Sequence, residues 1–359
     1  MRQLLSLLGS KKLLGLDIGT SSIKMAELDV SKNAATLVRF GYTPIIQGAV
    51  SGGEINDVPT VSESIRTLFT EGGFKRKSSN TGMFGTSVIT KKINMPRMEA
   101  KMVGEQIRWE AEQYIPFDLN EINLDYHIIQ NSQTVTATEN MDVLLIAAKQ
   151  EFIFKYMETV QSAGLNPSIV DVAGFALANC FEFNYGVMED EVVALLNIGA
   201  GVTNFVVVER GEVIFCRDIP VGGLTYTSDI SKEMGISFDE AEVLKLSAAQ
   251  GQEVPPEVGN AIISTNEIVC EEINNSFEFY AATSSGLSIS KFYASGGSIY
   301  LPNLLDQISN TVGVPYEVID PLKNVTYNKK AFSDEYIESI KPFAAIVIGL
   351  ALRKEGDSD

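Results

Sequence analysis

The sequence is poor in the side chains that bind transition metals. It contains three cysteines and one histidine in 359 residues. Cys180, Cys216 and Cys270 are far apart, with no Cys-x-x-Cys pair, and the histidine is His127. This pattern argues against a zinc site, and isolated cysteines are typical of a reducing compartment. We therefore expect each cysteine to pack as a small apolar residue.

Positive charge is also scarce. Lys and Arg number 28 against 46 Asp and Glu, which gives a formal net charge of −18. This balance argues against binding to nucleic acid and against direct binding to anionic lipid, since both need a cationic surface. A phosphate site in this chain must therefore use backbone N–H groups, a metal ion and local cations such as Lys24 and Lys245.

Long hydrophobic runs are absent as well. The apolar patch Leu4-Leu5-Ser6-Leu7-Leu8 near the N-terminus is too short to span a bilayer. It fits either a short surface-binding segment or a partly ordered helix. With 45% apolar residues, a chain of this length predicts a soluble α/β protein of two domains.

The stretch Leu13–Lys24, with the sequence LLGLDIGTSSIK, combines an apolar run with a polar turn. A buried strand would place Asp17 at its carboxyl end, Gly19 would allow a tight bend, and Thr20, Ser21 and Ser22 would follow. The N–H and O–H groups of such a turn can cradle a phosphate, and Asp17 can hold a divalent cation. An ordinary hairpin turn is the competing interpretation.

A second stretch repeats this design half a chain later. Leu195–Asn204, with the sequence LLNIGAGVTN, has an apolar strand, polar Asn197, Gly199, Gly201 and a hydroxyl residue. Both copies continue as apolar strands. Two such hairpins predict two related domains facing each other across one phosphate-bearing ligand.

These hairpins, followed by Ala294-Ser295-Gly296-Gly297-Ser298, resemble the actin-like ATPase superfamily, which includes sugar kinases and the cell-division protein FtsA. Three further segments are similar to the PilM family, the cytoplasmic actin-like proteins of type IV pilus assembly. They are Ile93–Pro96, Glu105–Phe117 and Leu124–Tyr126. The resemblance implies an α/β, actin-like (ribonuclease H-like) fold of duplicated domains, with an FtsA/PilM-type insertion in the first.

The resemblance also implies domain boundaries. The first domain comprises residues 1–80 and, after an inserted subdomain at 81–165, continues through 166–192 (connect-1). The second comprises 193–230, a nucleotide-capping subdomain at 231–285, and 286–338. Residues 339–359 form the connect-2 helix, returning to the first domain, and a polar tail.

In this superfamily the two hairpins and the late glycine turn bind ATP and Mg²⁺. The matching residues here are Asp17, Gly19, Thr20, Ser21, Ser22, Lys24, Asn197, Gly199, Ala200, Gly201, Thr203, Asn204, Gly296, Gly297 and Ser298, with Asp17 near the metal, directly or through water.

Three further sites are predicted, two of them with an alternative. Asp171 either hydrogen-bonds the water near the γ-phosphate, as the family pattern implies, or caps a helix. Gly222 and Gly223, at a predicted helix start, offer N–H groups to a phosphate. Glu242 and Lys245 share one helical face and, on family grounds, contact ribose and adenine. A surface ion pair is the alternative for them.

The inserted subdomain has a predicted helix over Glu99–Tyr114 and a second over Gln150–Ala163. Trp109 and the corner Tyr114–Phe117 either anchor a partner peptide or fill a small core. Upstream, Lys75–Asn80 reads as a solvated loop or a cationic patch.

The resemblance implies a cytoplasmic ATP-binding scaffold of pilus assembly, with the N-terminal cytoplasmic segment of the inner-membrane protein PilN as partner. That peptide is expected in a groove between the insertion and the rest of the first domain. Other platform proteins and pilus motors are further partners, and rings or homo-oligomers are expected. Because the tail Glu355–Asp359 is acidic rather than amphipathic, we expect membrane contact only through a partner.

Residue 197, in the second hairpin, bears on catalysis. Many actin-like proteins carry an Asp where this chain has Asn197, and an amide contributes no charge and accepts no proton from water. We therefore expect ATP binding with slow or absent hydrolysis. An FtsA-like membrane-associated polymer and a small-molecule kinase are the alternatives.

Overall fold

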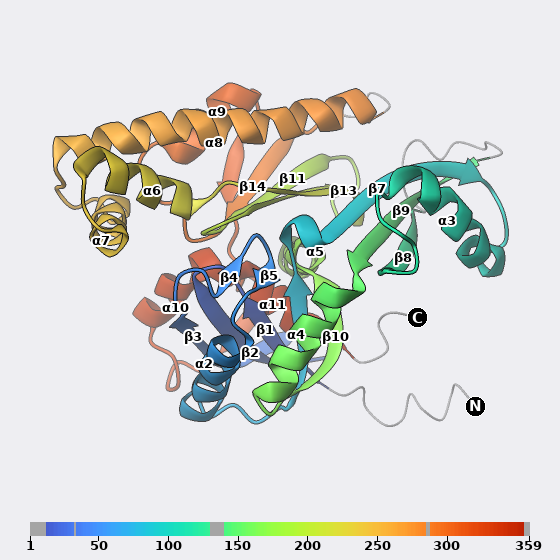
Figure 1. The fold of residues 1–359 in the computed structure, drawn as a ribbon, viewed down its shortest axis with the longest axis horizontal. Coiled ribbons are helices and arrows are strands. Elements are labelled where there is room, and N and C mark those ends of the chain that lie inside the picture. Colours follow the sequence, from blue (N-terminus) through green and yellow to red (C-terminus); the bar gives the residue numbers. More distant parts are fainter. Residues whose placement is uncertain (1–11, 32–33, 130–139, 285–287, 355–359) are drawn as a thin grey trace. The chain divides into compact units, whose positions relative to one another are not determined.

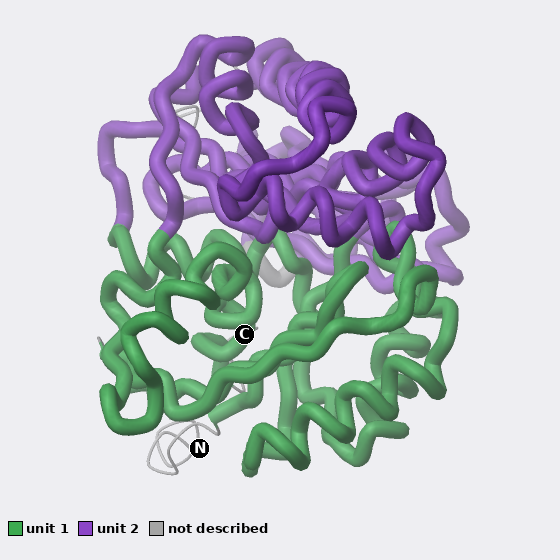
Figure 2. Tube along the Cα trace, turned by 90° about the vertical axis from the view of Figure 1, so that its left-hand side faces the viewer, with its two compact units in different colours: residues 1–84, 150–186, 320–359 green, residues 85–149, 187–319 purple. Residues whose placement is uncertain are grey.

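The computed structural model describes residues 12–31, 34–129, 140–284 and 288–354. The N-terminal apolar patch and the acidic residues 355–359 lie outside these ranges. The chain forms two compact units, coloured separately in Figure 2. Unit 1 comprises Met1–Phe84, Gln150–Gly186 and Asp320–Asp359, and unit 2 comprises Gly85–Lys149 and Val187–Ile319.

Unit 1 is built on a six-stranded sheet in the order β10-β6-β1-β2-β3-β16. The strands are β1 (Leu14–Ile18), β2 (Ser22–Val30), β3 (Ala35–Pro44), β6 (Ser78–Met83), β10 (Asn166–Val172) and β16 (Val325–Tyr327), with a small hairpin of β4 (Val50–Ser51) and β5 (Glu54–Ile55). The helices are α2 (Val58–Glu71), α4 (Gln150–Ser162), α5 (Ala173–Tyr185), α10 (Asp334–Ile340) and α11 (Ala345–Leu352). Helix α11 packs on β1, β2 and β6, α5 packs on β6 and β10, and α2 packs with α4.

Helices α5 and α11 cross at very short range. A Cβ atom placed on Gly349 would lie 1.8 Å from the carbonyl oxygen of Ala176. Only a glycine fits this crossing. Small residues thus allow the close approach of α5 and α11, which lie in the segments predicted as connect-1 and connect-2.

The solvated loop predicted for Lys75–Asn80 is right for the exposed Lys75 and Lys77 and wrong from Ser78 onward, where the chain enters the sheet. Arg76 donates to the carbonyl of Leu28, and the N–H groups of Lys75 and Arg76 donate to the buried carboxylate of Glu27. From Ser78 the chain forms β6, between β1 and β10. Two of its buried polar side chains donate to distant carbonyls: the Asn80 amide to Leu350 at 3.1 Å and the Ser79 hydroxyl to Asn166 at 3.3 Å.

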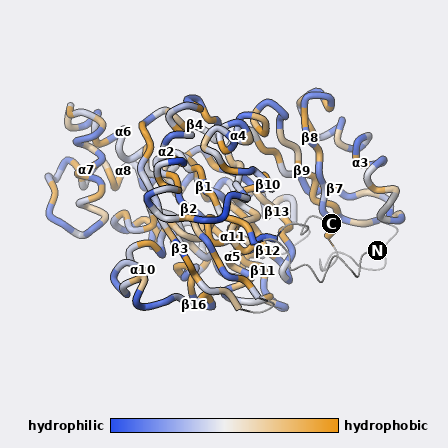
Figure 3. The backbone as a smooth tube through the Cα atoms, turned by 90° about the horizontal axis from the view of Figure 1, so that it is seen from below, coloured by the Kyte–Doolittle hydropathy of each residue, from blue (hydrophilic) through white to orange (hydrophobic). Residues whose placement is uncertain are grey.

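Unit 2 contains a five-stranded sheet in the order β13-β12-β11-β14-β15. The strands are β11 (Val192–Ile198), β12 (Thr203–Glu209), β13 (Glu212–Ile219), β14 (Lys291–Ser295) and β15 (Tyr316–Val318), and the helices are α6 (Gly223–Met234), α7 (Phe238–Ala249), α8 (Pro256–Thr283) and α9 (Leu304–Val312). The long helix α8 runs along this sheet (Figure 1), with the Phe277 ring 4.9 Å from the Phe205 ring. Hydrophobic colour follows β11 and β12 in Figure 3, where residues 193–196 and 205–207 are buried.

The inserted segment forms its own small sheet within unit 2, in the order β7-β9-β8. It comprises β7 (Val88–Pro96), α3 (Ala100–Tyr114), β8 (Ile122–Ile129) and β9 (Asn140–Lys149). Ile93, Ile107 and Leu145 are buried in the core between α3 and the sheet. The helix that we expected at the end of the insertion is α4, which belongs to unit 1 and packs on α2.

The two large sheets repeat one arrangement, as the duplicated hairpins predict. In unit 1, β1 pairs antiparallel with β2 and parallel with β6. In unit 2, β11 pairs antiparallel with β12 and parallel with β14. The predicted α/β fold of duplicated, actin-like domains is confirmed. Within the described ranges, no helix has the length and apolar character needed to cross a bilayer.

Candidate functional site

The two hairpins close with the same backbone bond. In unit 1 the N–H of Gly19 donates to the Ser22 carbonyl at 3.0 Å, and in unit 2 the N–H of Gly199 donates to the Val202 carbonyl at 3.0 Å. Each turn follows the carboxyl end of a buried strand. The similarity that the sequence predicts therefore extends to the turn geometry.

The residue pair behind each turn differs in charge. Asp17 and Lys24 face each other across the first hairpin and form an ion pair of 2.9 Å. Asn197 and Asn204 occupy the same positions in the second, and their amides form a hydrogen bond of 3.0 Å. The first hairpin thus has a carboxylate at this position, and the second has a neutral amide.

Asp171 lies on β10, two strands from Asp17. Its neighbour on β6 is Gly82, which follows the β6 residue paired with Leu16. The two carboxylates therefore belong to one row of the sheet, separated by two strand spacings, or about 10 Å. Asp171 does not cap α5, whose N-cap is Val172. Its Oδ2 lies 3.7 Å from Nε of Arg353, and the proposed role near the γ-phosphate stays a prediction.

The glycines at the start of α6 pack against the second hairpin, which takes up the N–H of Gly223. The N–H of Gly223 donates to the Gly199 carbonyl at 2.9 Å, and the N–H of Leu224 to the Ala200 carbonyl at 2.7 Å. A Cβ atom on Gly222 would lie 2.5 Å from the Gly199 oxygen. Our expectation that the helix start presents its N–H groups to a phosphate was therefore wrong for Gly223, although the helix start does contact the turn.

Lys245 is buried against this helix start. Its ammonium group donates to the Gly223 carbonyl at 3.1 Å, to Thr227 at 3.0 Å and to Glu242 at 2.7 Å. Burial lowers the pKa of Lys245, and the Glu242 carboxylate opposes this shift. The pair is therefore no ordinary surface ion pair, and the half-buried Glu242 side chain is the part that remains accessible.

The late glycine turn lies directly on the second hairpin. Gly296 has a φ of +103°, and a Cβ atom there would lie 2.2 Å from the Ile198 oxygen. Ser298 donates through its hydroxyl to the Gly199 carbonyl at 3.0 Å. A Cβ atom added to Gly297, by contrast, would have no heavy atom within 4 Å. The turn thus combines tight packing with an open position.

A chain of hydrogen bonds crosses the sheet beneath the second hairpin. The Ser295 hydroxyl donates to Oδ1 of Asn197 at 3.2 Å, and the Asn197 amide donates to Oδ1 of Asn204. The Asn204 amide donates to Asp218 at 2.7 Å, and the N–H of Gly85 donates to the same carboxylate at 2.5 Å. We call Ser295, Asn197, Asn204 and Asp218 the polar relay.

Asp218 fixes the direction of this relay. A carboxylate accepts hydrogen bonds, so Asn204 must turn its NH₂ group toward Asp218 and its oxygen toward residue 197. Residue 197 must then be a donor. An aspartate there would bring two carboxylate groups to one amide, which gives a structural reason for the amide at this position.

The relay predicts a pH dependence of stability. Burial raises the pKa of Asp218 from 3.8 to about 6, against the hydrogen bonds from Asn204 and Gly85. A carboxyl whose pKa is raised by folding stabilises the fold when protonated, so its contribution falls as pH rises from about 4 to about 6. The difference in unfolding free energy between wild type and Asp218→Asn should therefore fall across this window, by up to about 3 kcal/mol. Urea denaturation at each pH measures it, and a flat difference would contradict the assignment.

Sequence reasoning missed Asp218 because no motif surrounds it and its strand carries mixed polar and apolar residues. Sequence reasoning also assigned to the ligand two side chains whose hydrogen bonds are made within the protein. The buried hydroxyl of Thr203 donates to the Val221 carbonyl, and the Asn204 amide belongs to the relay. Thr20 and Ser22 are half-buried in the first turn, and Ser21 is exposed.

The residues predicted for unit 2 are thus brought together, and so are those of the first hairpin in unit 1. Each set lies at the carboxyl ends of the central strands of its own sheet. A duplicated α/β fold with glycine hairpins at these strand ends defines an actin-like ATPase-type protein.

Comparison with known proteins identifies the family within this class. The model of the family "Type IV pilus assembly protein PilM" matches residues 15–355, and the chain belongs to this family. A solved structure of a "PilM-PilN type IV pilus biogenesis complex" has a TM-score of 0.86 and 29% identity, covering 96% of this chain and 99% of that one. The ethanolamine utilization protein EutJ of Carboxydothermus hydrogenoformans shares the fold, with a TM-score of 0.56, 16% identity, and coverage of 95% of this chain and 89% of that one.

Among curated proteins, FtsA of Bacillus subtilis is 26% identical over 257 residues, or 64% of this chain. FtsA of Streptococcus pneumoniae is 25% identical over 263 residues, or 67% of this chain. Each alignment covers 56% of the FtsA length.

Proposed function

We propose that this protein is an ATP-binding scaffold of the type IV pilus assembly platform, which binds the N-terminal cytoplasmic segment of PilN and hydrolyses ATP slowly or not at all. The family supports the role in pilus assembly. The similarity to a PilM–PilN complex over nearly the whole chain supports the partner. In this proposal the protein is cytoplasmic, associates with the inner membrane through PilN, and contacts further platform proteins or motors as a homo-oligomer or ring.

The twin hairpin turns carry the nucleotide part of the proposal. Both hairpins would contact one ATP, with Asp17 holding Mg²⁺, and the open position at Gly297 would accept the adenosine. The half-buried Glu242 carboxylate would contact the ribose, and Lys245 would act by holding that carboxylate in place. Bound Mg²⁺ would supply the charge that neutralises the phosphates.

Slow hydrolysis follows from the second hairpin. Both ends of the Asn197 amide are engaged in the polar relay, so this residue offers neither a metal-binding charge nor a general base. We expect turnover far below about 1 per second, the lower end of typical enzyme rates. Release of inorganic phosphate measures it, and turnover at the rate of a sugar kinase would refute the proposal.

Trp109 is proposed to contact the partner peptide. Its side chain is 70% exposed on α3, which rules out the alternative that it fills the small core. With Arg108, Phe117 and Leu119 it lines a hollow of about 650 Å³. An exposed tryptophan beside such a hollow is typical of an interface hot spot.

Trp109→Ala is expected to weaken binding of the PilN N-terminal peptide at least about tenfold, because a hot-spot side chain is lost. Fluorescence anisotropy of a labelled peptide measures the affinity. Phe154→Ala, on α4, removes another aromatic side chain, 61% exposed, and should leave binding unchanged. If ATP binds normally but the peptide binds both variants as well as wild type, the Trp109 assignment fails while the nucleotide proposal stands.

A further inference from the structure

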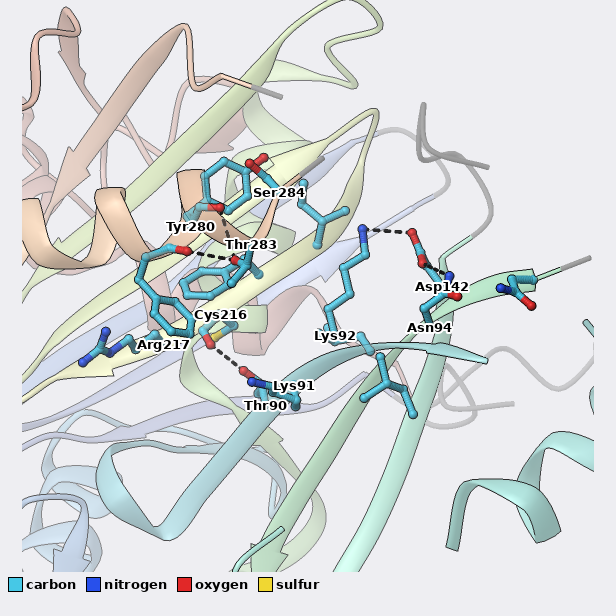
Figure 4. Close-up of a pocket in the computed structure, with 16 residues that line it drawn as sticks. Thr90, Lys91, Lys92, Asn94, Asp142, Cys216, Arg217, Tyr280, Thr283 and Ser284 are labelled. Atoms are coloured by element: carbon cyan, nitrogen blue, oxygen red, sulfur yellow. Dashed lines mark hydrogen bonds and ion pairs between the residues drawn. The ribbon is translucent and has the colours of Figure 1, made fainter. Parts of the chain in front are cut away.

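Unit 2 contains a cavity of about 750 Å³ that the proposed function does not use (Figure 4). It lies among β7, β9, β13 and the last turns of α8. This volume is within the range of about 300–1,000 Å³ that is typical of ligand pockets. The hollow beside Trp109 has a different lining.

The cavity exposes the edges of two strands. Residues 90–94 of β7 and 214–217 of β13 line it consecutively, whereas β9 contributes the alternate residues Asn140, Asp142 and Leu144. Successive side chains of a strand point to opposite faces of the sheet. A cavity that is lined by consecutive residues therefore lies along the edge of the strand. The face of β9 is therefore the floor, and the edges of β7 and β13 are the walls.

Both walls are end strands of their sheets. β7 is first in the order β7-β9-β8, and β13 is first in the order β13-β12-β11-β14-β15. Among the described residues, neither strand is paired through main-chain hydrogen bonds with another strand on its outer side. The two strands approach each other near the start of β7, where the Thr90 hydroxyl donates to the Cys216 carbonyl and the N–H of Gly85 donates to Asp218. An end strand offers unpaired main-chain N–H and C=O groups to an added strand.

The rim of the cavity is cationic in an otherwise acidic chain. Lys91 and Arg217 are exposed and lie over the Phe279 ring, at 5.9 and 5.8 Å from its centroid. Neither takes part in an ion pair with a carboxylate of the described residues. Lys92, in contrast, is paired with Asp142 at 2.9 Å (Figure 4). The whole chain has a net charge of −18. Two cations at the rim without carboxylate partners therefore favour an acidic ligand.

We propose that this edge-strand groove binds an extended, acidic segment of a partner protein. The segment pairs its main chain with the outer edge of β7 and places carboxylates beside Lys91 and Arg217. Five residues of strand span about 17 Å. The part of β7 that lines the cavity can therefore pair with a segment of about five residues. Strand addition supplies affinity through main-chain bonds, and the cations supply selectivity. The site is separate from the Trp109 hollow and does not depend on ATP binding.

The test uses a synthetic peptide with alternating valine and acidic residues, acetyl-Val-Asp-Val-Glu-Val-Asp-amide, titrated into the full chain by calorimetry. Saturable 1:1 binding is expected. The variant Lys91→Ala/Arg217→Ala should bind the peptide at least about tenfold more weakly. The matched variant Lys75→Ala/Lys330→Ala removes two exposed cations of unit 1 and should bind within about twofold of wild type.

Backbone methylation tests the strand pairing. Two versions of the peptide carry N-methyl groups at odd or at even positions, and only one set of N–H groups faces β7. One version should therefore lose binding while the other retains it. The proposal is overturned if the parent peptide fails to bind at 1 mM, if both methylated versions bind like the parent, or if free glutamate competes as well as the peptide.

Discussion

Gly296→Ala is expected to weaken ATP binding at least about a hundredfold. The new Cβ atom would lie 2.2 Å from the oxygen, 2.5 Å from the carbon and 2.6 Å from the nitrogen of Ile198, all of them backbone atoms. Moving backbone atoms costs more free energy than moving the end of a flexible side chain. The glycine turn must therefore shift away from the second hairpin. The φ of +103° adds strain. Calorimetric titration with ATP and Mg²⁺ measures the loss.

The control for this variant is Gly251→Ala, which separates strain from steric overlap. Gly251 also has a positive φ, +71°, but a Cβ atom there would meet no heavy atom within 4 Å. It should lose about 1 kcal/mol of stability and keep its ATP affinity. A folded Gly296→Ala protein with wild-type affinity would show that the turn does not form part of the nucleotide site.

Gly349→Ala is expected to lower the free energy of unfolding by about 3 kcal/mol or more, at the upper end of the cost of overpacking. Its Cβ atom would lie 1.8 Å from the Ala176 oxygen and 2.6 Å from the Ala176 carbon, so α5 and α11 must separate. Urea denaturation measures the change.

Gly259→Ala provides the reference for that experiment. Gly259 lies in helix α8, where a Cβ atom would meet no heavy atom within 4 Å. It should gain up to about 1 kcal/mol from helix propensity. Equal stability of the two variants would contradict the close crossing of α5 and α11.

The hairpins could be predicted from sequence because local chemistry determines them. A buried strand, a tight turn at Gly19 or Gly199, and a returning strand are all encoded within about ten residues. The same holds for the N-terminus of α7, where Ser237 and Glu240, three residues apart in sequence, form a capping box. Such signals depend on neighbours in sequence and need no tertiary context.

The polar strand β6 could not be predicted in this way. Ser79, Asn80 and Thr81 are fully buried, yet their sequence is typical of a loop. Their placement depends on partners far along the chain, such as the Leu350 carbonyl that accepts from Asn80. Hydrophobic periodicity does not report a strand whose burial is offset by long-range hydrogen bonds.

The polar relay escaped prediction for a related reason. Asp218 acts on the second hairpin through Asn204, fourteen residues away in sequence and on the neighbouring strand. The sequence shows Asn197 as a departure from the family pattern, but only the hydrogen-bond directions explain why an amide fits there. The exposure of Trp109 likewise depends on which face of α3 meets the small sheet.

The central claim is that one nucleotide uses both hairpins, and calorimetric titration with ATP and Mg²⁺ tests it most directly. Wild type should bind one ATP per chain. Asp17→Asn, in the first hairpin, and Gly199→Val, in the second, should each weaken binding at least about tenfold. Two independent sites in wild type, or wild-type affinity in either variant while the protein remains folded, would contradict the account.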